Sequence, residues 1–153
     1  MQIISEQRIK AHKIIISPRP VWKCRTCPMF GKTPSCPPLV PSWQESLEWL
    51  KRFSNALLIK FEVETKNFQQ DKREILNYLL EKETQLFREG YLYCLALFPG
   101  NCNLCDQCDF QKKGECPQPS RVRPSMDAIG VECSSIIEIN FSEPVLYGLL
   151  LID

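Results

Sequence analysis

Four cysteines lie within one short segment of the chain and are spaced to hold a metal cluster. Two residues separate each of the first three cysteines, and seven residues separate the third from the fourth. Three thiolates on such a short loop can wrap around a polynuclear core, and the fourth can reach it from the longer excursion. The segment therefore predicts a 4Fe-4S cluster bound by Cys102, Cys105, Cys108 and Cys116.

Zinc is the main alternative metal for this segment. Structural zinc sites usually take two Cys-x2-Cys pairs separated by a longer stretch. Here three cysteines crowd one turn and the fourth stands alone before Pro117. The spacing is similar to the bacterial ferredoxin run, although that run has three residues before its final Cys-Pro. The layout favours iron–sulfur, and zinc remains the alternative.

A second group of cysteines lies near the N-terminus and comprises Cys24, Cys27 and Cys36. Three thiols are one ligand short of a complete site, which leaves three hypotheses open. The group could bind a second cluster with one iron left for another ligand, water or substrate. Cys94 or Cys133 could complete it, or it could share a site with the second group. The alternative without metal is a redox or structural Cys-x2-Cys pair.

The two remaining cysteines give weaker signals. Cys94 lies inside an apolar stretch, which favours a buried small hydrophobic residue, and the role of Cys133 is undecided. A disulfide framework is disfavoured because the count of nine is odd and residues 1–17 do not resemble an export signal. We therefore expect a cytoplasmic protein. His12 is the only histidine, so no nucleophilic triad is supported.

Length and charge limit the number of domains and the kinds of partner. The 153 residues predict one cysteine-rich metal-binding domain spanning residues 1–153. A net charge of +1 gives no electrostatic footprint for nucleic acid or an anionic membrane. No stretch approaches the length of a transmembrane helix. We expect neither nucleic acid nor a membrane as a partner.

The remaining sequence predicts the elements that must position the cysteines. The pattern indicates an α+β fold with a small mixed sheet covered by helices, and with the two cysteine loops meeting at one end of the sheet. The predicted strands are 13–16, 56–63, 91–98 and 145–152; the helices are 43–53 and 67–89, with short ones in 125–130 and 131–140; the cysteine loops are 21–41 and 101–119.

Local signals support the two longer helices. Ser42 and Glu45 form a capping-box pattern at the start of the first, and Gly90 is placed to end the second. The second has an apolar stripe of Ile75, Leu76, Leu79, Leu80, Leu86 and Phe87, with charges including Asp71, Lys72, Glu81 and Lys82 expected on its other faces.

Two arginines, Arg121 and Arg123, follow the second cysteine loop. Guanidinium groups there could stabilise an anionic cluster, bind an anionic substrate or belong to a solvated turn.

Several motifs resemble a known family of predicted metal-binding proteins, the domain of unknown function numbered twenty-two eighty-four. The first cysteine group continues into Gly31-Lys32 and Ser35-Cys36-Pro37-Pro38. Pro99-Gly100 precedes the second group, which continues into Arg123-Pro124-Ser125-Met126-Asp127-Ala128-x-Gly130, and the chain closes on Tyr147-Gly148-Leu149-Leu150-Leu151-Ile152. The resemblance implies seven metal-binding cysteines: Cys24, Cys27, Cys36, Cys102, Cys105, Cys108 and Cys116. Cys94 and Cys133 fall outside the motifs.

Three functions are compatible with these residues. The first is an electron carrier with one or two 4Fe-4S clusters and a redox protein partner. The second is an enzyme that binds a small-molecule substrate at the open iron of the three-cysteine site. The third is a structural zinc module. The sequence leaves open whether the protein is an enzyme.

Overall fold

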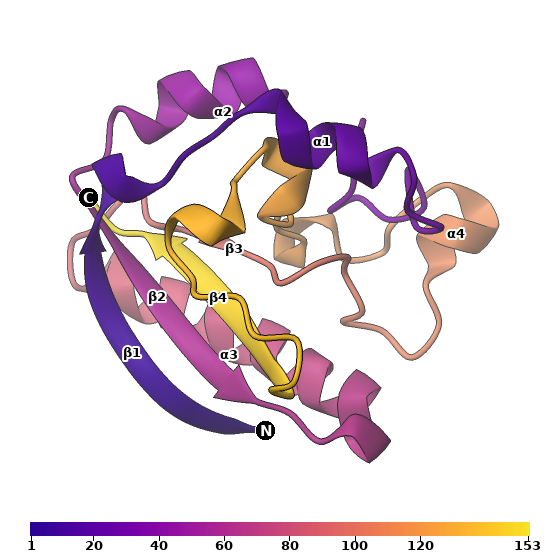
Figure 1. The fold of residues 1–153 in the computed structure, drawn as a ribbon. Coiled ribbons are helices and arrows are strands. Elements are labelled where there is room, and N and C mark those ends of the chain that lie inside the picture. Colours follow the sequence, from indigo (N-terminus) through magenta and orange to yellow (C-terminus); the bar gives the residue numbers. More distant parts are fainter.

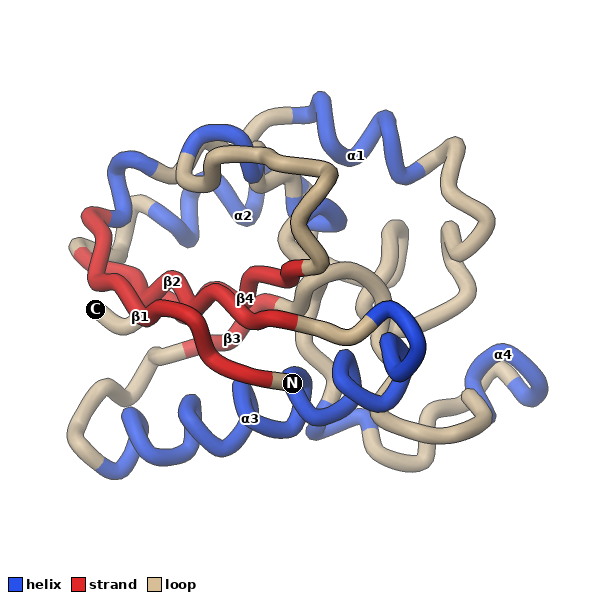
Figure 2. The backbone as a smooth tube through the Cα atoms, turned by 60° about the horizontal axis from the view of Figure 1, so that its bottom comes forward, coloured by secondary structure: helices blue, strands red, loops and turns tan.

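Apolar runs near the middle and the end of the chain form the two central strands of a four-stranded sheet. The computed structural model describes all residues 1–153, and its sheet has the order β1-β2-β4-β3. Helix α3 covers one face, whereas α1 and α2 lie over the other (Figures 1 and 2). The α+β class is confirmed. All three strand pairings are antiparallel, and a parallel contact occurs only in the isolated bridge between Phe98 and Ser125.

Helices and strands are interspersed along the chain, and the longer loops carry the two cysteine groups. Their bounds are β1 Gln2–Lys10, η1 Ala11–Lys13, α1 Pro18–Cys24, α2 Trp43–Leu50, β2 Asn55–Glu62, η2 Thr65–Asn67, α3 Phe68–Arg88, β3 Leu95–Leu97, α4 Asp109–Lys113, η3 Pro119–Arg121, η4 Asp127–Ile129, η5 Cys133–Ser135 and β4 Val145–Leu151. The elements labelled η are short 3-10 helices.

Strand β2 is buried on both faces and separates two hydrophobic cores. Leu57, Ile59 and Phe61 face α3, while Ala56 and Leu58 face the opposite side, as the two-residue period of a strand requires. The first core also contains Ile75, Leu76 and Leu79 of α3, and the second contains Ile14, Ile16, Ile129 and Val131. Each fully buried side chain of this size contributes roughly 1.5–3 kcal/mol to stability.

Both longer helices form close to their predicted limits. Ser42 Oγ accepts from the Glu45 amide at 3.2 Å, and the Glu45 carboxylate accepts from the Ser42 amide at 2.8 Å, so the capping box is confirmed. Helix α3 ends at Arg88, with Glu89 as its C-cap, and Gly90 follows with a φ of +107°. Along α3 two predictions are wrong. Phe87 is 53% exposed, and Asp71 and Lys72, which were expected on exposed faces, are buried.

The N-terminal strand prediction is also wrong. Residues 13–16 do not form a strand, because Ile14 and Ile16 project into the second core from an irregular segment. The first strand is instead Gln2–Lys10, a largely exposed edge strand paired with β2. The predicted loop 21–41 begins inside α1, and the predicted strand 91–98 narrows to Leu95–Leu97. Among the helices, none combines the length and apolarity needed to cross a membrane.

Candidate metal centre

The first cysteine group lies at the end of α1 and in the turns that follow it. Ser17 caps α1 by accepting from the Arg19 amide at 3.2 Å, and Pro18 starts the helix, where its missing N–H costs nothing. The helix ends at Cys24, and the Cys27 amide then donates to the Cys24 carbonyl at 3.0 Å. These turns leave Cys24 half-buried and Cys27 exposed, and the next turns bury Cys36.

An ion pair fixes α1 on the segment after η4. The Arg19 guanidinium donates to both carboxylate oxygens of Glu132, at 2.8 and 2.7 Å, and Ser17 Oγ donates to the same carboxylate at 2.5 Å. Arg19, and then Ser17, lower the pKa of Glu132 to about 2. The Ser17 amide also donates to the Gly130 carbonyl at 2.9 Å. These contacts set where Cys24 lies relative to η4.

The second cysteine group leaves the sheet after β3 and is held against α3. Arg73 Nε donates to the Asn103 carbonyl at 3.1 Å and Arg73 Nη2 to the Cys105 carbonyl at 3.3 Å. Arg73 also pairs with Asp106. One α3 side chain therefore clamps the loop that carries Cys102, Cys105 and Cys108. Cys108 directly precedes α4, and Cys116 follows its left-handed end at Gly114.

The two cysteine loops meet through a buried hydroxyl pair. Thr33 and Ser35 are both 0% exposed, and their hydroxyl oxygens lie 2.8 Å apart. Thr33 Oγ1 is 3.1 Å from Cys36 Sγ, while Ser35 Oγ accepts from the Cys102 amide at 2.7 Å. A continuous chain of hydrogen-bonding groups therefore links a thiol of the first group to the backbone of the second.

Within each group the thiols lie in electrostatic reach of one another. Burial, the Asp127 carboxylate and then Cys27 and Cys36 raise the pKa of Cys24 to about 11. Burial also raises the pKa of Cys102, with further contributions from the three other cysteines of its group, Cys108, Cys105 and Cys116. Thiolates crowded in this way repel each other unless a cation or metal compensates their charge.

Several sulfur atoms receive N–H donors. The Met29 amide lies 3.4 Å from Cys27 Sγ, and Gln118 Nε2 lies 3.6 Å from Cys105 Sγ. The Leu104 backbone N–H acts on Cys102 and lowers the pKa of that thiol, against the raising effect of burial. Donors directed at sulfur favour the thiolate form that binds metal, so this donor set fits a thiolate-bound metal or cluster.

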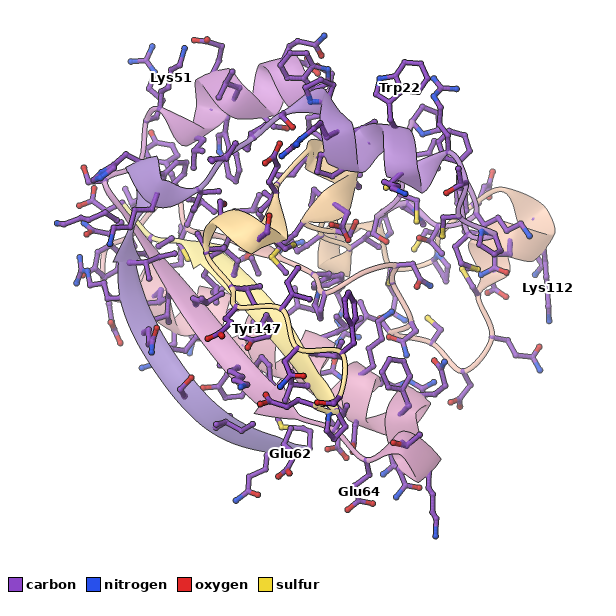
Figure 3. All side chains as sticks on the ribbon, in the orientation of Figure 1. Trp22, Lys51, Glu62, Glu64, Lys112 and Tyr147 are labelled. Atoms are coloured by element: carbon purple, nitrogen blue, oxygen red, sulfur yellow. The ribbon has the colours of Figure 1, made fainter.

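The side-chain view agrees with this description of the thiols. All nine cysteines are free, and sulfur atoms gather between the end of α1 and α4 (Figure 3). No three histidine, cysteine or acidic side chains lie together as ligands of a single metal ion. The structure thus brings the two predicted groups side by side, while the ligand assignments themselves remain predictions.

Cys94 and Cys133 do not belong to the two predicted cysteine groups, and their surroundings differ from each other. Cys94 is buried in the first hydrophobic core, where burial raises its pKa to about 12. Cys133 Sγ lies 3.7 Å from Asp127 Oδ1, and burial followed by the Asp127 charge raises its pKa to about 12. Asp127 therefore influences both Cys133 and Cys24, although its side chain keeps an exposed face.

The two arginines after the second loop are engaged with other protein groups. Arg123 binds the Glu83 carboxylate through Nε at 3.0 Å and Nη2 at 2.7 Å. Arg121 donates to Gln118 Oε1 at 2.8 Å and contacts Asn77. Arg121 thus orients Gln118, the donor to Cys105, whereas Arg123 anchors the loop to α3.

Fold and site together define a cysteine-rich α+β protein with two adjacent thiol groups. The chain belongs to the family described as predicted metal-binding protein (DUF2284), whose model matches residues 7–145. This match confirms the family resemblance and supports metal binding. Comparisons with the curated proteins and with the solved structures found no match.

Proposed function

We propose that this protein binds a 4Fe-4S cluster at Cys102, Cys105, Cys108 and Cys116 and a second cluster or metal at Cys24, Cys27 and Cys36, and that it transfers electrons with a redox protein partner. One electron would arrive from a reduced donor and leave to an oxidised acceptor, so that the cluster is unchanged over a full cycle. The chain's own residues hold the cluster, direct N–H donors at its sulfurs and limit its contact with water.

One observation carries this proposal. The two groups of free thiols, 66 residues apart at their nearest members, Cys36 and Cys102, meet across the Thr33–Ser35 hydroxyl pair. Thiolates within one group repel each other unless a metal compensates their charge, and N–H groups are directed at the sulfur atoms of Cys27 and Cys105. Metal binding explains why the fold gathers and orients them.

An enzyme with an open iron is the second candidate, and the position of Asp127 bears on it. We infer that Asp127 is the non-cysteine ligand of the first site. Helix α1, which ends at Cys24, packs against η4, which begins at Asp127. The hydrogen-bond partner of this carboxylate is only the weak donor Cys133. A carboxylate is exchanged more readily than a thiolate, so a substrate could displace it.

Metal analysis of anaerobically purified protein tests the proposal. We expect iron and acid-labile sulfide in equal amounts, and an electron paramagnetic resonance signal that appears on reduction with dithionite. A colourless protein with stoichiometric zinc would contradict both the electron-transfer proposal and the open-iron alternative, and would leave the structural zinc module.

A ligand titration separates the two iron-dependent candidates. A carrier in which every iron keeps its protein ligands should have the same spectrum when cyanide is added. A spectrum that shifts on addition of cyanide would favour the open-iron enzyme instead.

A further inference from the structure

Lys72 is a buried cation between the two cysteine loops. It lies in the second turn of α3 and is 6% exposed. The N-terminal turns of α3 lie toward the end of the sheet where the cysteine loops and α4 are found (Figure 1). Lys72 Nζ makes one hydrogen bond, to Asn101 Oδ1 at 3.1 Å, and a Cβ added at Gly100 would lie 3.5 Å from Nζ. The ammonium is therefore enclosed by the backbone that leads into Cys102.

No carboxylate in the structure pairs with this ammonium. The neighbouring Asp71 is directed away, to the N-terminal amine of Met1 and the Glu64 amide. Burial lowers the pKa of Lys72 below its ordinary value, and the charges of Cys102 and then Cys36 oppose that shift. The backbone beside this ammonium continues into Cys102, whose amide donates to Ser35 Oγ of the first cysteine loop. Lys72 therefore lies next to the junction of the two loops.

Burying an ammonium without a compensating charge is costly. Thiols must lose their protons to bind metal, so metal binding at either loop supplies negative charge beside Lys72. The cost of burying Lys72 is then offset only in the metal-bound protein.

We propose that Lys72 is the shared counter-charge of the two cysteine sites and couples their metal binding. The inference rests on the proposed function, because it requires negative charge from metal-bound thiolates at both loops. Lys72 is a positioning residue here: it acts through the charge of the sulfurs and not on the metal itself. Metal at one site also orders the ammonium that the other site needs.

Lys72→Met tests this, since methionine has a similar length and no charge. Lys82→Met is the matched control, because Lys82 lies on the same helix and pairs with Glu6 away from the cysteine loops. Metal content, the rate of metal loss to a chelator and the urea midpoint of metal-free protein would be measured for each. We expect Lys72→Met to lose metal from both sites about tenfold faster than wild type, and its metal-free form to be at least as stable as wild type.

Lys72→Gln separates charge from hydrogen bonding, because glutamine can still donate to Asn101 Oδ1. We expect it to lose metal as fast as Lys72→Met. If Lys72→Gln retains metal like wild type, the hydrogen bond matters and the counter-charge role is wrong. The counter-charge role would also be overturned if Lys72→Met destabilised the metal-bound and the metal-free protein equally and left the rate of metal loss unchanged. Wild-type protein that binds no metal would overturn the proposed function, and this inference with it.

Discussion

The Cys102 backbone amide donates a 2.7 Å hydrogen bond to Ser35 Oγ, and this bond joins the second cysteine loop to the first. Because Ser35 is 0% exposed, no water can replace its hydroxyl. Ser35→Ala should therefore destabilise the protein by about 1–3 kcal/mol, the cost of a buried unsatisfied donor. Urea unfolding measures this, and metal content should fall at both sites.

The exposed Ser120→Ala is the control for this substitution, and it should change neither quantity. Ser35→Ala protein with wild-type stability and metal content would show that the two loops are positioned independently.

Cys105→Ser tests the four-cysteine site directly. If metal organises this loop, the substitution should lower metal content and the urea midpoint together, since metal-binding free energy is then folding free energy. Cys94→Ala is the control: it removes a buried core thiol and should reduce stability without reducing metal content. A fully metallated and stable Cys105→Ser protein would contradict the ligand assignment.

Asp127→Ala tests the fourth ligand of the first site. We expect this variant to lose the metal of the first site and keep that of the second. Asp127→Cys should restore binding, because a thiolate replaces the carboxylate, and should alter the electron paramagnetic resonance signal. Asp109→Ala serves as a control from the second loop region. Unchanged metal content and spectrum in Asp127→Ala would remove Asp127 from the site.

The Glu132–Arg19 pair makes the anchoring of α1 dependent on pH. The folded-state pKa of Glu132 is lowered from 4.5 to about 2, so its contribution to stability is complete above pH 4.5 and is lost as the pH falls towards 2. Metal-free Glu132→Gln should therefore be less stable than wild type at pH 7, and the difference should shrink between these two values. Urea midpoints across that range measure it, with the exposed Glu81→Gln as a control.

Gly130 fixes the approach of α1 and α2 to η4. Its φ is +92°, and an added Cβ would lie 2.5 Å from the Ser17 carbonyl oxygen and 2.9 Å from Trp43 Cβ. Gly130→Ala should therefore cost about 1–2 kcal/mol of backbone strain and a further ~1–3 kcal/mol of overpacking.

Gly90→Ala measures the backbone strain of a positive φ without the overpacking that is expected at Gly130. Gly90 has a φ of +107° with no atom within 4 Å of an added Cβ, so thermal unfolding should show the smaller loss. Equal losses in the two variants would mean that α1 is not held by this contact.

Local signals were sufficient where one segment determines its own structure. The Ser42–Glu45 capping box fixes the start of α2, and the apolar stripe of α3 identifies its buried face. β1 could not be predicted in this way, because an exposed edge strand has no buried face to leave a periodic pattern. Ile14 and Ile16 instead suggested a strand, since periodicity does not distinguish a buried strand from buried irregular chain.

In the candidate site, too, some features follow from local sequence and others depend on tertiary structure. Spacing predicts the four-cysteine group, and the family resemblance adds Cys24, Cys27 and Cys36, but the meeting of the two groups through Ser35 depends on tertiary structure. Asp127 belongs to the Arg123-Pro124-Ser125-Met126-Asp127-Ala128-x-Gly130 motif, yet only the packing of η4 against α1 indicates a role for it. Lys72 could not be identified, because a lysine on an amphipathic helix is normally on its solvated face.

Exposure differs sharply among the seven motif cysteines: Cys27 alone is exposed, and the four of the second loop are partly covered. Oxidation of thiolates follows their accessibility, so dissolved oxygen or peroxide should damage the first site before the second. Protein handled in air would then retain metal at the second site only, and the two sites of one molecule would lose metal at different rates.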